Sequence, residues 1–460
     1  MTTFLSGSRR DFLSAGVKLT AAGTLLAAGM GAGVQAAGSA ANPGPIPGGG
    51  GSTAARYTLR NVRLEEGFEK EQEQVIATHT GLYDVDIDGD VIAAIRPAGG
   101  ERARPGIDAK GALMLPATRD MHIHLDKTFY GDPWQAPRPR NSVLEMIELE
   151  KKLIPKLLPR SAERAEKLIA LLQSKGTTFA RSHCNIEPVS GLKSLEHLQT
   201  ALEKHRQDFA CEIVAFPQHG LLRSHSEKLM REAMQMGAKY VGGLDPTAVD
   251  GAMEKSLDTL FSIALDNRAG VDIHIHETAP SGLAAIRYMI ETVRQNPELK
   301  GKVTLSHAFA LATIEGEKRD EVIADLAQQR FSIATTVPIG RLVMPLPQLR
   351  AAGVPVMTGT DSLQDHWQPF GTGSMLEKAN LYAQVYHTPD EFSLSRALGV
   401  GTGGILPLSD TGERQWPAPR HAADFMLVKA HCSAEAVARI SPVLATFHRG
   451  RPVYGEITGA

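Results

Sequence analysis

The residues of this sequence that are best suited to chemistry are histidines and acids that recur in short clusters. His122 and His124 form an HxH pair, and residues two apart on a strand project to the same side. Later clusters contain His274 within HIHE, His307 within SHA and Asp361 within GTDS. Imidazole nitrogens and a carboxylate oxygen are ligands that suit zinc or iron. The ordered set therefore predicts a site for a divalent metal, and these ligand types permit either zinc or iron.

Other polar residues hold comparable positions, and their roles stay open. His183, Gln218 and Asp245 each come directly after, or close behind, a short apolar run. His183 fits a structural role as well as a functional one. For His276, a ligand role is the less favoured interpretation, because His274 and Glu277 already complete the HIHE motif.

Eight short apolar runs, separated by helical patterns, must position these residues. Repeated strand–helix units imply parallel strands joined by crossover helices. Eight units favour a closed (β/α)₈ TIM barrel, whose chemistry lies at the C-terminal ends of its strands; an open doubly wound sheet is the alternative. The runs are Leu113–Met121, Thr177–Ser182, Glu212–Phe216, Tyr240–Leu244, Val271–Ile275, Lys302–Ser306, Phe331–Thr335 and Val354–Thr358.

The segments on either side of the barrel predict a smaller β domain. Residues 57–113 alternate apolar and polar side chains between turn signals, as short antiparallel strands do. Residues 418–460 also contain strand-like segments, and we expect them to return to the same layer. The predicted architecture is a barrel over residues 114–417 with a composite β-sandwich domain built from both flanking segments.

The first residues have the layout of an export signal. The stretch SRRDFLS contains the twin arginine Arg9 and Arg10, and an apolar run follows it to about Gly33. Val34-Gln35-Ala36 then fits a small-x-small cleavage site. We expect residues 1–36 to be a twin-arginine signal peptide and residues 37–56 a flexible linker, which predicts export to the periplasm through the Tat machinery. The alternative is a short N-terminal helix of the mature fold.

Composition narrows the classes of partner. The 460 residues carry a formal net charge of −2, so the chain has no basic field that would bind nucleic acid. The three cysteines, Cys184, Cys211 and Cys432, fit no zinc ribbon or disulfide framework. The charged stretch Glu148–Lys156 is most simply interpreted as the solvated face of a helix.

The motifs resemble those of the amidohydrolase superfamily, and in detail those of its cytosine deaminase-like and N-isopropylammelide hydrolase-like branch. The similar segments are HIHLDK, AFPQHG, HIHE, SHA and GTDSLQDHWQPFG, within residues 57–455. The resemblance implies four metal ligands: His122, His124, His274 and Asp361. Binuclear members of the superfamily bridge two metals through a lysine at the end of the fourth strand. Asp245 follows that strand here, so one divalent ion is expected.

The resemblance also implies roles around the metal. Glu277 would transfer protons, and His307 would stabilise charge on the attacked centre. Gln218 would hold a ring amide of the substrate, and Trp367 would line the pocket. The chemistry of the residues agrees, because a metal lowers the pKa of bound water, a leaving amine needs an acid, and developing charge needs a donor. Asp361 would ligate the ion and accept a proton from the water.

Two positions bear on the substrate. Cytosine deaminases carry a second aspartate after the metal aspartate, where this chain has Ser362. With Lys127 directly after HIHLD, the motif resembles instead the branch that hydrolyses N-substituted amino-triazines. By that resemblance, Lys127 would hold a ring carbonyl or a carboxylate of the substrate. We expect a small pyrimidine- or triazine-like ring as substrate and deamination as the reaction. The alternatives are hydrolysis of a cyclic amide, N-acyl or N-alkyl bond, and a catalytically silent binding protein. Barrels of this kind often form homo-oligomers.

Overall fold

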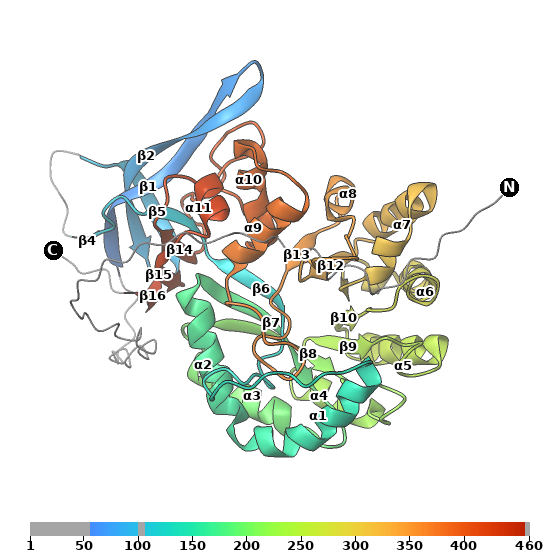
Figure 1. The fold of residues 1–460 in the computed structure, drawn as a ribbon. Helices are drawn as coiled ribbons and strands as arrows, with labels where there is room; N and C mark the ends of the chain where they lie inside the picture. Colours follow the sequence, from blue (N-terminus) through green and yellow to red (C-terminus); the bar gives the residue numbers. More distant parts are fainter. Residues whose placement is uncertain (1–55, 100–105, 456–460) are drawn as a thin grey trace, which may run out of the picture. The chain divides into compact units, whose positions relative to one another are not determined.

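Two β-sheets organise residues 56–99 and 106–455, which are the residues that this computed structural model describes (Figure 1). The predicted signal peptide, and the linker up to residue 55, lie outside the described residues. None of the described helices is long and apolar enough to cross a membrane. One sheet contains the barrel strands β6 (Thr118–Ile123), β7 (Thr177–Asn185), β8 (Ala210–Phe216), β9 (Tyr240–Leu244), β10 (Gly270–His274), β11 (Val303–Ser306), β12 (Ser332–Thr335) and β13 (Val356–Thr358).

The barrel strands pair in parallel and in chain order from β6 to β13. A parallel bridge between Ile123 and Asp361 then joins the last strand region to the first. Helices cover the outer face, and this explains why the strands are buried along most of their length rather than on one face only. The predicted (β/α)₈ barrel is confirmed. The helices are α1 (Val143–Leu157), α2 (Ser161–Ser174), α3 (Lys193–Lys204), α4 (Glu227–Gln235), α5 (Met253–Asp266), α6 (Ser281–Gln295), α7 (Gly316–Gln328), α8 (Leu346–Ala351), α9 (Met375–Val385), α10 (Glu391–Ala397) and α11 (Ser433–Arg439).

The second sheet is the composite β domain. Its strand order places β14 between β5 and β15, so the C-terminal segment returns to the N-terminal one (red beside blue in Figure 1). Phe425 stacks on Phe447 in the core of this domain, with ring centroids 4.4 Å apart. The predicted composite domain is therefore confirmed. Its strands are β1 (Arg56–Glu71), β2 (Gln74–Asp88), β3 (Val91–Pro97), β4 (Ile107–Asp108), β5 (Leu113–Pro116), β14 (Phe425–Val428), β15 (Val443–His448) and β16 (Arg451–Tyr454).

Two details of the expected strands were wrong. The run Leu113–Met121 is not one barrel strand: β5 pairs with β14 in the small domain, and β6 begins the barrel two residues later. An apolar run reports burial and cannot reveal that the chain changes sheets within it. The strands after residue 57 are also not all short, because β1 and β2 form a hairpin of 16 and 15 residues. The exposed, charged end of this hairpin lacks the apolar alternation that would have marked it.

Helix α1 is placed across the ends of barrel strands. Its Ile147 packs in one apolar cluster with Phe216 at the end of β8 and Leu244 at the end of β9. Trp367, from the segment after β13, packs against the same cluster. The helix therefore lies at the C-terminal face of the barrel, where the chemistry of this fold is located.

Candidate metal and substrate site

The predicted metal ligands converge at the C-terminal face of the barrel. The ligand atoms of His122, His124, His274 and Asp361 all lie within 4.8 Å of one another. Asp361 Oδ1 lies 3.4 Å from His122 Nε2 and 3.2 Å from His124 Nε2. The four side chains come from β6 and the residue directly after it, from β10, and from the segment after β13. Strands on opposite sides of the barrel thus supply a single cluster of three nitrogens and one carboxylate.

The chemistry of this cluster fits a divalent metal ion. Both ring nitrogens of His274 are buried and have no hydrogen-bond partner among the described residues. Burial alone would raise the pKa of Asp361, but the His122 and His124 rings hold it well below its usual range. An ionised carboxylate and unprotonated imidazoles are the forms that bind zinc or iron.

A chain of buried polar groups orients His122. Its Nδ1 lies 2.8 Å from the Ser306 hydroxyl, which donates to Asp272 Oδ1 at 2.6 Å. Arg181 donates to the other oxygen of Asp272 at 3.1 Å. Such partners behind a histidine fix its ring and its tautomer. They leave Nε2 of His122 directed toward Asp361.

His183 lies beneath the cluster and does not line the cavity described below. It is 0% exposed, and its ring centroid is 4.3 Å from that of His122. His122, His183 and Asp272 are close enough together to hold a metal. The Asp272 carboxylate is already bound by Arg181 and Ser306, which favours a packing role for His183.

Three residues of the site hold strained backbone conformations. Asp245, His307 and Asp361 have φ angles of 39°, 68° and 60°. Non-glycine residues adopt this left-handed region rarely and at an energetic cost. All three residues follow barrel strands, so the strain is concentrated where side chains must turn toward the barrel axis.

Asp245 organises the HIHE segment. Its carboxylate accepts from the backbone N–H of His276 at 2.6 Å and from that of Glu277 at 3.2 Å. It also lies 2.8 Å from His276 Nδ1. Burial lowers the pKa of His276, but Asp245 outweighs this effect and raises it overall. Asp245 therefore sets the orientation of the segment that carries Glu277.

Glu277 is a buried acid beside the cluster. Its Oε1 accepts from the backbone N–H of Ala248, and its Oε2 has no partner within the described ranges. Burial raises the pKa of Glu277, and the Ala248 N–H opposes the shift. A carboxyl group with a raised pKa is suited to exchange protons near neutral pH.

His307 faces the cluster from the neighbouring strand end. Its Nε2 lies 3.8 Å from Asp361 Oδ2, and its ring centroid lies 4.3 Å from that of His276. Burial holds the pKa of His307 well below its ordinary value. A lowered pKa favours the neutral ring, which has one N–H to donate.

A cavity of about 330 Å³ opens above the cluster. Most of the predicted site residues line this cavity, whereas His122 and Glu277 do not. Its size suits a small ring compound. The lining consists of His124, Lys127, Arg140, Val143, Gln218, Leu244, His274, His276, His307, Phe309, Thr336, Asp361, Ser362, Trp367 and Gln368.

The four predicted substrate residues lie together along this cavity. Lys127 is only 4% exposed, and its ammonium group donates to the amide oxygen of Gln218. The same ammonium lies 5.3 Å from the centre of the Trp367 ring. Ser362 is buried and lines the cavity beside Asp361. A cation, an amide, an indole and a hydroxyl thus surround the space above the metal-type cluster.

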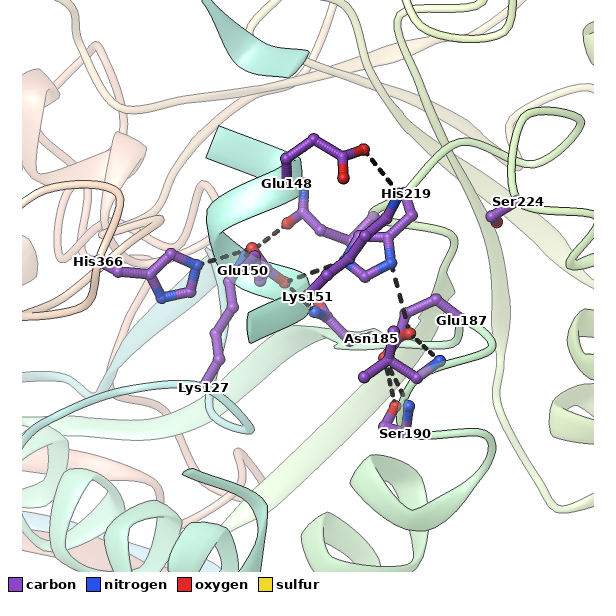
Figure 2. A network of polar contacts seen from close by, with 12 residues as sticks. Lys127, Glu148, Glu150, Lys151, Asn185, Glu187, Ser190, His219, Ser224 and His366 are labelled. Atoms are coloured by element: carbon purple, nitrogen blue, oxygen red, sulfur yellow. Dashed lines mark hydrogen bonds and ion pairs between the residues drawn. The ribbon is translucent and has the colours of Figure 1, made fainter. Parts of the chain in front are cut away.

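The solvated helix face expected over Glu148–Lys156 was wrong for one residue. Glu150 is 0% exposed, and its carboxylate lies among Lys127, His366 and Asn185 (Figure 2). The buried residues of α1 are Met146, Ile147, Glu150 and Ile154. Glu150 therefore occupies the apolar stripe of this helix, four residues after Met146. Its position in the apolar stripe was the one signal in the sequence that Glu150 is buried. The high charge of the segment obscured that signal.

Comparisons with known proteins agree with this geometry. The Amidohydrolase family model matches residues 157–454. The chain is 57% identical over 462 residues to the uncharacterized protein YahJ of Escherichia coli (strain K12), with 99% of each chain covered. It is 30% identical over 327 residues to the N-isopropylammelide isopropyl amidohydrolase of Pseudomonas sp. (strain ADP), covering 69% of this chain and 79% of that one. The crystal structure of N-isopropylammelide isopropylaminohydrolase from Burkholderia multivorans superposes with a TM-score of 0.75 at 31% identity, covering 88% of this chain and 100% of that one.

Proposed function

The chain belongs to the amidohydrolase family, as its motifs predicted, and we propose that it is a mononuclear metal hydrolase that releases an amine from a carbon of a small nitrogen heterocycle. As a member of this family, the protein is a hydrolase that acts on carbon–nitrogen bonds other than peptide bonds. A deamination of the cytosine deaminase type leads the proposal. Hydrolysis of a cyclic amide, N-acyl or N-alkyl bond at the same site is the second candidate.

One observation carries the proposal: His122, His124, His274 and Asp361 place four ligand atoms within 4.8 Å of one another, and the last three of these residues line the cavity. Two relatives at 30% and 31% identity are named as hydrolases of N-isopropylammelide, an N-substituted amino-triazine. Those names support a ring substrate that loses an amine. The same names support the N-alkyl part of the second candidate, because the leaving group there carries an alkyl substituent.

The four residues would hold one zinc or iron ion. Such an ion supplies Lewis-acid activation of water near neutral pH. Asp361 would accept the proton that the attacking water releases. Glu277 would carry that proton to the leaving amine, which is a poor leaving group until it is protonated. His307, a neutral imidazole facing Asp361, would donate to the charge that develops on the attacked centre.

The cavity wall would hold the ring. Lys127 and Gln218 would bind ring carbonyl or amide groups, and Trp367 would pack against the ring face. Ser362 offers a hydroxyl where a second aspartate would place a negative charge. This composition supports rings that carry oxygen substituents over rings that are cationic.

The test is the release of ammonia or alkylamine by the metal-reconstituted protein. Cytosine, isocytosine, creatinine and N-alkylated amino-triazines form the panel. Glu277→Gln serves as the blank, because it should keep its metal and lose turnover. Full turnover by Glu277→Gln would refute the proton transfer drawn here. No amine from any compound, with metal bound, would favour hydrolysis of a cyclic amide, in which the nitrogen stays attached to the product.

A further inference from the structure

A single buried carboxylate connects α1 with two loops and one strand end at the mouth of the barrel. Glu150 Oε2 lies 2.7 Å from His366 Nε2 and accepts from Trp367 Nε1 at 2.7 Å. The same oxygen lies 3.9 Å from Lys127 Nζ, and Oε1 accepts from the Asn185 amide. Figure 2 shows Glu150 between His366 and Asn185, with Lys127 beside it. These partners belong to the segments that follow β6 and β13 and to the end of β7.

We infer that Glu150 is a positioning residue that fixes Lys127, Gln218 and Trp367 in the geometry that binds an oxo-substituted ring. The inference rests on the proposed function, since it concerns the substrate of the same cavity. Glu150 does not line the cavity, so it acts through the residues that it holds.

Glu150 supplies the counter-charge for Lys127. The ammonium is almost completely buried, and an isolated buried cation is very costly. An opposite charge at 3.9 Å offsets part of the cost of burying this cation. Lys127 donates to Gln218 Oε1, which uses one of the two acceptor sites of that oxygen. The NH₂ group of Gln218 and the remaining Lys127 N–H groups are then the donors available to a ligand, and they require acceptors such as ring carbonyl oxygens.

Glu150 also fixes the indole of Trp367. The N–H of this ring is its only polar group, and it donates a hydrogen bond to the Glu150 carboxylate. The adjacent His366 binds the same carboxylate oxygen. Two neighbouring side chains of one loop therefore share one anchor, and the ring face of Trp367 is held at a fixed angle against the cavity.

The contacts of Glu150 also extend to the segment after β8, which carries Gln218. His219 Nε2 lies 4.0 Å from Glu150 Oε1, and its Nδ1 lies 3.4 Å from Glu187 Oε2. Glu187 in turn accepts from the backbone N–H and the hydroxyl of Ser190. His219 thus lies between two buried carboxylates, and it directly follows Gln218. All three proposed ring contacts are therefore connected to Glu150, either directly or through one neighbour.

The test compares Glu150→Gln with Glu148→Gln in the full-length, metal-loaded protein. Glu148 lies on the same helix, but it is 53% exposed and pairs with Lys151 at the surface. Both variants remove one negative charge, and only Glu150→Gln removes it from the carboxylate that contacts Lys127, His366 and Trp367. Titration calorimetry with cyanuric acid and with uracil measures binding without amine release, because neither ring carries an amine to lose. We expect Glu150→Gln to weaken binding about tenfold, and Glu148→Gln to leave it within about twofold of wild type.

A double-mutant cycle with Lys127→Met shows whether Glu150 acts through the lysine. Residues that act as one unit give non-additive effects. We expect the double variant to bind the rings no more than about twofold more weakly than Lys127→Met alone. Additive losses would overturn the inference, as would equal binding by the two glutamine variants or no binding of either ring by the wild-type protein.

Stability and metal content distinguish positioning from general damage. Breaking a buried ion pair is more disruptive than removing both partners. If Glu150→Gln fails to fold, Glu150→Gln/Lys127→Met should recover cooperative unfolding and full metal content, and failure to recover would overturn the pairing. A silent amine-release assay together with weakened ring binding by Glu150→Gln would refute the proposed reaction and leave the positioning role standing.

Discussion

The backbone N–H of Asp361 donates to the carbonyl oxygen of His122 at 2.6 Å. This bond joins the segment after the last barrel strand to the first strand, between two of the proposed metal ligands. The closure of the barrel and the assembly of the metal cluster therefore share the same few residues. A change that opens this seam should affect the fold and the metal together.

Gly359 offers a direct test of the seam. A Cβ atom added there would lie 2.4 Å from the His122 carbonyl oxygen and 2.6 Å from its backbone nitrogen. Real contacts are longer, so one of the two strands must move. We expect Gly359→Ala to lower the free energy of unfolding by about 1–3 kcal/mol and to weaken metal binding. Denaturant unfolding and metal analysis after dialysis measure both effects.

Gly399→Ala is the matched control, because a Cβ atom there meets its nearest neighbour at an ordinary 3.5 Å. Its free energy of unfolding should lie within about 0.5–1 kcal/mol of the wild-type value, and it should keep its metal. Equal stability of the two alanine variants would show that the seam tolerates the extra atom.

Asp361→Asn separates the side chain from the backbone at the same position. The substitution keeps the N–H that bonds to His122 and removes the carboxylate charge. We expect metal affinity to fall by more than the roughly 10–100-fold that loss of an outer-shell partner causes. The near-ultraviolet circular dichroism of the metal-free protein should be retained. Full metal occupancy after dialysis would exclude Asp361 as a ligand.

The contribution of the composite β domain to the stability of the fold should depend on pH. Burial alone would raise the pKa of Asp424, but the His448 ring at 2.6 Å and the Arg449 N–H hold it below its usual value. A lowered carboxyl pKa stabilises the fold above the ordinary value of about 4, and this stability is lost as the pH falls through the lowered pKa.

Asp424→Asn removes this contribution. We expect the variant to be about 1 kcal/mol less stable than wild type at pH 6, with the difference shrinking below about pH 4. Urea unfolding at a series of pH values measures it. A difference that persists unchanged at pH 3 would mean that the His448 contact does not depend on the ionised carboxylate.

The residues that gather at the barrel mouth could be predicted because the fold has a simple rule. Parallel strands in chain order end at one face, so residues after successive runs must meet. His122, His124, His274 and Asp361 do meet there. Family motifs then suggested their roles, which the arrangement of side chains alone does not assign.

What escaped prediction depended on contacts between distant segments. The chain changes sheets after Pro116, and the residues on both sides of the change are mostly buried, so burial alone does not mark it. The charge of Glu150 suggested solvent, yet its partners Lys127, Asn185 and His366 come from other parts of the chain. A carboxylate in the apolar stripe of a helix indicates that such partners exist, but not which residues they are.

The N-terminal segment gives a prediction that depends only on residues before the described fold. Twin-arginine export requires the arginine pair, and lysine preserves charge without reproducing the guanidinium groups. We propose that Arg9 and Arg10 direct the enzyme to the periplasm. Replacing both with lysine should keep the protein in the cytoplasm with an uncleaved N-terminus, as measured by fractionation and mass spectrometry. Periplasmic protein cleaved after Ala36 in that variant would refute the twin-arginine route, whereas cytoplasmic wild-type protein would refute export itself.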